Sequence, residues 1–125
     1  MLVVDSSLLV EHLRGNARAT RFLETQAKQG PLAVPALVLW ELWKGASTPA
    51  RMAAVENLLD AVQPDPFAPA MARLAGVLHQ DHQRRGVERP AIDLLIASHA
   101  IHHDCPLATL DRDYRSIKGL QVVHP

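Results

Sequence analysis

The chain has 125 residues, a length that fits one domain spanning residues 1–125. Its apolar fraction of 48% excludes a disordered protein, and its formal net charge of zero argues against tight, indiscriminate binding to phosphate backbones. One cysteine, Cys105, excludes an internal disulfide framework or cysteine-based zinc site. The start of the chain does not read as a signal peptide, and no run approaches the ~20 apolar residues of a membrane span. We therefore expect a cytoplasmic protein without membrane contact.

Short apolar runs alternate with segments of helical periodicity along the chain. Capping residues, prolines and glycines mark most boundaries, as Asn16 and Gly30 do for the second helix. In the first half of the chain the pattern predicts a strand at 2–4, helices at 8–14 and from the Asn16 cap to about 29, a strand at 32–34, and helices at 36–44 and from 49 to about 62. A connection at 63–66 has room for a short strand, and a helix from 67 decays into a polar run at 79–89. A helix at 91–103 and strands at 106–109 and 120–123 complete the prediction.

This alternation predicts the fold class. Buried apolar strands that follow helices form parallel sheets covered on both faces. We therefore expect an α/β protein with three layers, α/β/α, around a central parallel sheet of four to five short strands. In such sheets, ligands bind outside the carboxyl ends of the strands, which is where functional side chains should lie.

Acidic residues follow two of the predicted strands. Asp5 comes directly after the strand at 2–4, and Asp111 and Asp113 come shortly after the strand at 106–109. Because parallel strands end at the same edge of a sheet, these residues are expected near one another. The sequence leaves an ordinary alternative open, since aspartate also serves as a helix N-cap, for Asp5, or as a turn residue, for Asp111.

Two further acids interrupt apolar helices. Glu41 lies within Ala36–Trp43, and Asp93 lies within Ala91–Ala97. A carboxylate in such surroundings is costly unless something compensates its charge. The compensation is either a bound cation or a buried ion pair with an arginine that the sequence does not identify.

Carboxylates that converge on one point repel each other, and a divalent cation removes that cost. A ligand set made only of oxygen suits Mg²⁺ or Mn²⁺ rather than zinc. One or two such ions can activate a water and stabilise the charge on a phosphodiester. The acids therefore favour metal-assisted phosphoryl chemistry.

Four motifs contain these acids in a fixed order, and a final apolar segment follows them. They are Val3-Val4-Asp5-Ser6-Ser7, Glu41-Leu42-Trp43-Lys44-Gly45-Ala46, Asp93-Leu94-Leu95-Ile96-Ala97, Leu107-Ala108-Thr109-Leu110-Asp111-Arg112-Asp113, and the closing Gly119-Leu120-Gln121-Val122. Together they resemble the PIN-domain family, and VapC-type toxins especially, over the whole chain. Ile92, where many relatives are polar, and Trp40 and Trp43, where smaller residues are usual, depart from the family pattern without removing an acid.

The resemblance implies a function and a set of site residues. It implies a Mg²⁺- or Mn²⁺-dependent endoribonuclease with one or two ions, acting on RNA as a toxin, forming homodimers and inhibited by a cognate antitoxin protein. By this resemblance the catalytic acids are Asp5, Glu41, Asp93 and Asp111. The metal ligands are Asp5, Asp93, Asp111 and, as in some relatives, Asp113. The hydroxyl groups near the site are those of Ser6 and Thr109. Two alternatives stay open: a PIN-like interaction module with an idle acidic site, and a small phosphatase or receiver-like domain.

Other features have ordinary interpretations. Of the seven histidines, His99, His102 and His103 share one predicted helix, but a zinc site needs three or four converging ligands and the sequence supplies no obvious partner for them, so solvated or capping roles are expected, with metal binding as the alternative. Arg84, Arg85 and Arg89 form a basic cluster that we interpret as a solvated face, with steering of RNA phosphates as the alternative. One of the two tryptophans is expected in the core and the other in a dimer interface.

Overall fold

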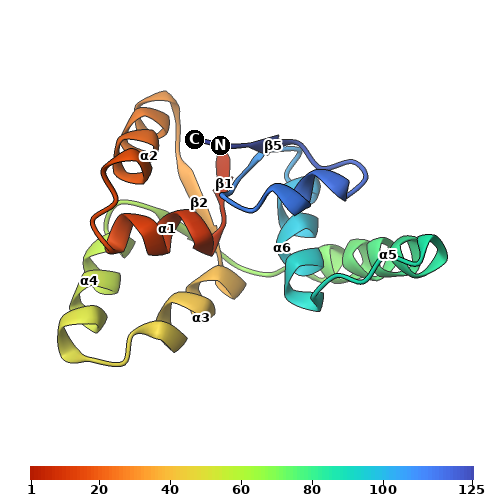
Figure 1. Cartoon of the computed structure of the whole chain (residues 1–125), viewed down its shortest axis with the longest axis horizontal. Coiled ribbons are helices and arrows are strands. Elements are labelled where there is room, and N and C mark those ends of the chain that lie inside the picture. The colour runs from red at the N-terminus through yellow and green to blue at the C-terminus, as the bar shows by residue number, and fades with distance from the viewer.

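The computed structural model describes residues 1–125 (Figure 1). The elements are β1 (Leu2–Val4), α1 (Ser6–Leu13), α2 (Ala17–Gln29), β2 (Leu32–Pro35), α3 (Ala36–Gly45), α4 (Pro49–Leu59), β3 (Gln63–Asp65), α5 (Pro69–Arg85), α6 (Ala91–His102), β4 (Leu107–Ala108), a 3₁₀ helix (Arg112–Ser116) and β5 (Val122–Val123). The alternation of strands and helices that the sequence predicts is confirmed.

The five strands form one parallel sheet in the order β3-β2-β1-β4-β5. The central strand β1 pairs on one side with β2, where Val3 lies opposite Ala33, and on the other with β4, where Val3 lies opposite Leu107. These three strands are buried on both faces, which explains why their sequences are continuous apolar runs rather than alternating ones. The carboxyl ends of β1 and β4 therefore open side by side.

Helices enclose the sheet (Figure 1). In this view α1 to α4 lie on one side of β1, and α5 and α6 lie on the other. The core is aliphatic, as the scarcity of aromatic residues predicts, with Tyr114 as its one buried aromatic ring. None of the helices has the length and apolar character that crossing a membrane requires.

Helix α5 is longer than the sequence pattern predicts. We expected it to decay after Leu78, but it continues to Arg85. The reason is that Leu78 and His82 are four residues apart and both buried, so the polar segment retains an inner face. The Nδ1 atom of His82 is 2.9 Å from the carbonyl oxygen of Leu78, and Gly86, with φ of 68°, ends the helix.

The two tryptophans of α3 have different surroundings. Trp43 packs against the core, which confirms a core role for one of them. Trp40 is 54% exposed, and the ammonium group of Lys44 lies 4.5 Å from its ring centroid. A dimer contact through Trp40 stays a prediction.

Candidate active site

Asp5 ends the central strand and is only 5% exposed. It occupies the N-cap position of α1, but its side chain forms no capping hydrogen bond, so the simple cap interpretation is wrong. Instead, Oδ2 of Asp5 accepts hydrogen bonds from Oγ of Ser7, at 3.0 Å, and from Oγ1 of Thr109, at 2.7 Å. The carboxylate is therefore held in place by hydroxyl groups from α1 and from the end of β4.

The same two hydroxyls also bind the loop that follows β4. The backbone N–H of Leu110 donates to Oγ of Ser7, and the backbone N–H of Asp111 donates to Oγ1 of Thr109, both at 3.0 Å. Each hydroxyl thus joins Asp5 to a loop that carries the next acid. Sequence reasoning named Ser6 and Thr109 but missed Ser7, which is the residue that contacts Asp5.

Glu41 lies on α3 and points one oxygen into the protein. Its Oε1 atom is buried and has no hydrogen-bond partner. Burial raises the pKa of Glu41; Ser6 opposes this rise, and the negative charges of Asp5 and Asp93 add to it. Asp5 and Asp93 are thus the two predicted acids whose negative charges act on Glu41, and Ser6 acts on it in the opposite direction.

Asp93 lies in the first turn of α6. Its Oδ1 accepts a hydrogen bond from the hydroxyl of Tyr114, at 3.2 Å, and its Oδ2 lies 3.6 Å from Nε of Arg89. Burial raises the pKa of Asp93, and the charges of Asp5 and Asp111 raise it further against the opposing effect of Arg89. Burial also raises the pKa of Tyr114, which keeps that hydroxyl protonated as a donor.

Arg89 stands between two of the acids. Its side chain is 7% exposed, and its Nη2 atom lies 3.6 Å from Oδ2 of Asp111. The guanidinium group also stacks over the ring of Tyr114, 4.6 Å from the ring centroid, and its Nε and Nη2 atoms form no hydrogen bond. The expectation that Arg89 belongs to a solvated face is wrong, and the unidentified arginine partner of Asp93 is this residue.

Asp111 and Asp113 differ in their contacts. Oδ1 of Asp111 accepts from the backbone N–H of Asp113, at 2.9 Å, and so caps the 3₁₀ helix, as a turn residue would. Its other oxygen faces Arg89. Asp113 is exposed and takes part in hydrogen bonds through its backbone, not through its carboxylate.

The donor set fits a hard divalent cation. The acids brought together are oxygen ligands, which Mg²⁺ and Mn²⁺ prefer. The orphaned Oε1 of Glu41 is a buried acceptor that such an ion, or a water bound to it, would satisfy. The pKa values of Glu41 and Asp93 are raised, so the protein without a bound cation disfavours the ionised form of both carboxylates.

A second polar cluster lies elsewhere in the molecule. Its members are Asp65, at the end of β3, His99 on α6, and His103, which is the C-cap residue of α6. The prediction of solvated or capping histidines is wrong for His99, which is fully buried. Burial lowers the pKa of His99, whereas the contacts with both histidines hold the pKa of Asp65 below its usual range despite its partial burial. Sequence reasoning found the histidines but not Asp65, which is 34 residues away from His99 in the chain.

Comparison with known proteins identifies the family. The sequence model of the PIN domain matches residues 2–120. Ribonuclease VapC10 of Mycobacterium tuberculosis is 36% identical over 111 residues, which cover 89% of this chain and 83% of that protein.

Solved structures share the fold. VapBC2 from Rickettsia felis, in a crystal structure with a DNA fragment from its promoter, has a TM-score of 0.92 and 23% identity, with 99% of this chain and 98% of that chain covered. A toxin–antitoxin complex from Klebsiella pneumoniae has a TM-score of 0.80 and 21% identity, with 98% and 96% covered. With the site, the family match and the ribonuclease relative in agreement, the chain belongs to the PIN-domain family, in its VapC group.

Proposed function

We propose that this protein is a metal-dependent endoribonuclease that acts as the toxin of a toxin–antitoxin pair. The observation that carries the proposal is that Thr109 contacts both Asp5 and the N–H of Asp111, while Arg89 lies 3.6 Å from both Asp93 and Asp111. Glu41, which has a buried oxygen without a partner, is the fourth acid that we assign to this site. A site this acidic disfavours a phosphodiester unless cations are present. Membership in the VapC group supplies RNA as the substrate class.

The chain's own residues would hold the reacting groups in place. We assign Asp5, Asp93 and Asp111 as ligands of one or two Mg²⁺ or Mn²⁺ ions, with Asp113 at the exposed margin. When bound, such ions lower the pKa of a water and neutralise charge on the phosphate. Ser7 and Thr109 fix the orientation of Asp5, Tyr114 fixes that of Asp93, and Ser6 acts on Glu41. A water would then attack phosphorus and displace one ribose oxygen, so that one P–O bond forms, one breaks, and the proton lost by the water is matched by the one that the departing oxygen gains.

The proposed partners are RNA, a cognate antitoxin and a second copy of the chain. A hollow of about 310 Å³ adjoins Glu41 between α1, α3 and α4, and apolar side chains such as Val10, Leu13, Leu42 and Val55 line it together with Arg14 and Arg51. Such a mostly apolar hollow suits the apolar segment of a protein partner. Solved relatives are VapBC and toxin–antitoxin complexes. This role places the protein in the cytoplasm, where its RNA is.

Cleavage of structured RNA by the chelator-treated protein tests the proposal. We expect no cleavage in excess chelator, and activity after addition of Mg²⁺ or Mn²⁺. Asp5→Asn, which removes a charge but keeps the shape, should stay inactive with either ion. Cleavage in excess chelator would end the metal assignment, and a folded, Mn²⁺-binding protein that cleaves no RNA would favour the idle interaction module.

A further inference from the structure

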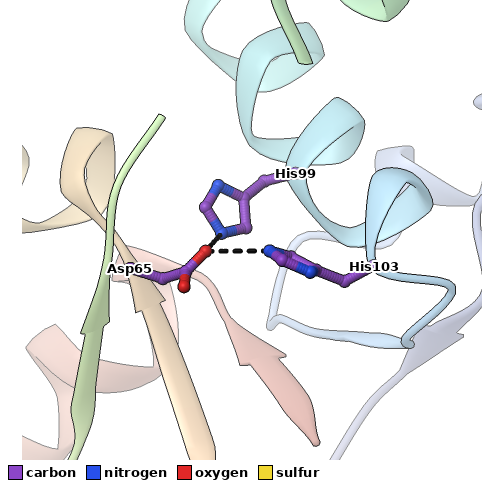
Figure 2. A group of neighbouring side chains, drawn as sticks. All are labelled: Asp65, His99 and His103. Atoms are coloured by element: carbon purple, nitrogen blue, oxygen red, sulfur yellow. Dashed lines mark hydrogen bonds and ion pairs between the residues drawn. The ribbon is translucent and has the colours of Figure 1, made fainter. Parts of the chain in front are cut away.

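The cluster at the end of β3 has the geometry of a metal site. Figure 2 shows the imidazoles of His99 and His103 pointing from α6 toward the carboxylate of Asp65. The Nε2 atoms of His99 and His103 lie 2.6 Å and 2.8 Å from the same atom, Oδ2 of Asp65. One ligand atom from each residue lies within 4.8 Å of the other two. Three ligand atoms thus converge on one point, and a small outward movement of Asp65 would admit an ion between them.

The burial of these residues is uneven in a way that suits an ion. His99 is fully buried; its Nδ1 has no hydrogen-bond partner, and its Nε2 meets only Oδ2 of Asp65, 2.6 Å away and outside good hydrogen-bond geometry. A buried polar group that is poorly paired costs free energy, which coordination of Nε2 to an ion would offset. Asp65 and His103 have side chains that are each 28% exposed, so an ion can reach the cluster from solvent.

We propose that Asp65, His99 and His103 bind a transition-metal dication, with Zn²⁺ as the representative ion. Two imidazoles and one carboxylate, with water in the remaining position, form a common donor set for such ions, whereas Mg²⁺ prefers oxygen alone. Histidines four residues apart on one helix face the same side, which is the spacing that a helical zinc ligand pair requires. Bonds of roughly 2.0–2.1 Å around an ion set the ligand atoms about 3.3 Å apart, so Oδ2 of Asp65 needs to move away from the two Nε2 atoms by roughly 0.5–0.7 Å.

This site is separate from the acidic one. Asp93 lies in the first turn of α6, and His99 and His103 follow six and ten residues later, or roughly 9 Å and 15 Å along the helix axis. An ion at the cluster would connect the edge strand β3 to α6, which contacts the central strand β1. We therefore expect it to stabilise the fold and not to participate in RNA cleavage.

Calorimetric titration of the metal-stripped full chain with Zn²⁺, in millimolar Mg²⁺ to fill the acidic site, tests the proposal. We expect one Zn²⁺ per chain, and a rise in melting temperature on its addition. His103→Gln keeps an N–H donor for Asp65 but lacks the imidazole, so it should preserve the fold and weaken Zn²⁺ binding by about 100-fold or more, since even outer-shell partners are worth 10–100-fold. Asp65→Asn should do the same.

Two control variants separate this site from its neighbours. His102→Gln changes an exposed histidine on the same turn, and Asp93→Asn changes the acidic site. Both should bind Zn²⁺ like the parent. Equal Zn²⁺ affinity in His103→Gln and the parent would overturn the proposal, as would loss of the Zn²⁺ signal in Asp93→Asn, which would place the ion among the acids. Co²⁺ offers a second readout, because visible absorption bands of a low-symmetry nitrogen and oxygen site should appear in the parent and disappear in His103→Gln.

Discussion

The two carboxylate oxygens of Asp111 have separate roles. Oδ1 caps the 3₁₀ helix through the N–H of Asp113, and Oδ2 faces the guanidinium of Arg89. The side chain of Asp111 can therefore serve in the turn and in the acidic site at the same time. Asp5 differs, because its N-cap position is unused and its hydrogen bonds go to Ser7 and Thr109.

Asp93→Asn separates a ligand from an ion-pair partner. If Asp93 holds a cation, cleavage with Mg²⁺ should fall by about 100- to 1000-fold, as when other preorganised charge-stabilising groups are removed. In chelator at neutral pH the variant should melt at the same temperature as the parent or higher, because burial and the charges of Asp5 and Asp111 disfavour the ionised form. A variant that melts much earlier but still cleaves would show that Asp93 serves mainly to pair with Arg89.

Arg89→Gln tests whether the guanidinium competes with the bound ion. Arg89 lies 3.6 Å from both Asp93 and Asp111, which we assign as ligands, and its positive charge repels a dication. We expect Mn²⁺ affinity to rise about tenfold, or about 1.4 kcal/mol, in a calorimetric titration. Arg85→Gln removes the same charge from an exposed pair with Asp81 and should leave Mn²⁺ affinity unchanged. Weaker Mn²⁺ binding by Arg89→Gln would mean that Arg89 instead holds the acids in their binding geometry.

Thr109→Val removes the hydroxyl that joins Asp5 to the loop after β4. The buried carboxylate loses its shorter hydrogen bond, and the N–H of Asp111 loses its acceptor, so stability should fall by about 1–3 kcal/mol. Cleavage should fall as well, because Asp5 is less firmly oriented. Thr109→Ser keeps the hydroxyl and is the matched control. Urea unfolding in chelator and cleavage with Mg²⁺ measure the two effects, and equal cleavage by both variants would exclude an orienting role for this hydroxyl.

Helix α6 connects the two sites, and the turn that precedes it contains Arg89. That turn begins at Gly86, whose φ of 68° ends α5 in the left-handed region. Because α5 ends there, the chain turns into the segment that carries Arg89, whose guanidinium lies over the ring of Tyr114. The end of α5 is therefore part of how the acidic site is built.

Replacing two glycines of the α5 region with alanine should change stability in opposite directions. Gly86→Ala places a side chain in a left-handed conformation and should destabilise by about 1 kcal/mol. Gly76→Ala lies within α5, where a Cβ meets no atom within 4 Å, and should stabilise by about 0.4–1 kcal/mol through the unfolded chain. Thermal melting of the two variants measures the difference. The same direction of change in both would contradict the conformational argument.

Local patterns predict elements, but not contacts between distant segments. The strands and most helices follow from apolar runs, caps and glycines, and Asp5 and Asp111 follow from where strands end. The burial of Arg89 depends on α5 packing along α6, and the partner of His99 comes from β3, so neither has a local signal. Tyr114 could have been noticed as the only tyrosine, three residues after Asp111, with a hydroxyl that needs a partner if buried.

For the whole molecule, pH should change stability through the acidic site. Burial raises the folded-state pKa values of Glu41 and Asp93, so in chelator the folded protein holds these protons more tightly than the unfolded chain. The resulting stability is present at low pH and is lost as pH rises from the ordinary values, 4.5 and 3.8, through the raised ones. Buried His99 has a lowered pKa and acts oppositely, destabilising the fold as pH falls below 6.5.

The difference in melting temperature between Asp93→Asn and the parent measures the contribution of Asp93 alone, because His99 is present in both proteins. In chelator this difference should be near zero at about pH 4 and should grow by a few degrees toward neutral pH. Adding Mn²⁺ should remove it or reverse its sign, because the ion stabilises only the parent's charged site. A difference that is largest at low pH would contradict the raised pKa of Asp93.

The central place of β1 has a consequence for synthesis of the protein on the ribosome. The strand and loop that supply Thr109 and Asp111 pair with β1 but follow Asp5 by more than 100 residues. A nascent chain therefore contains no complete acidic site until the segment around Thr109 and Asp111 has emerged from the ribosome. Translating ribosomes are thus not exposed to a working nuclease during its synthesis, and truncated products that end before β4 should be harmless to the cell.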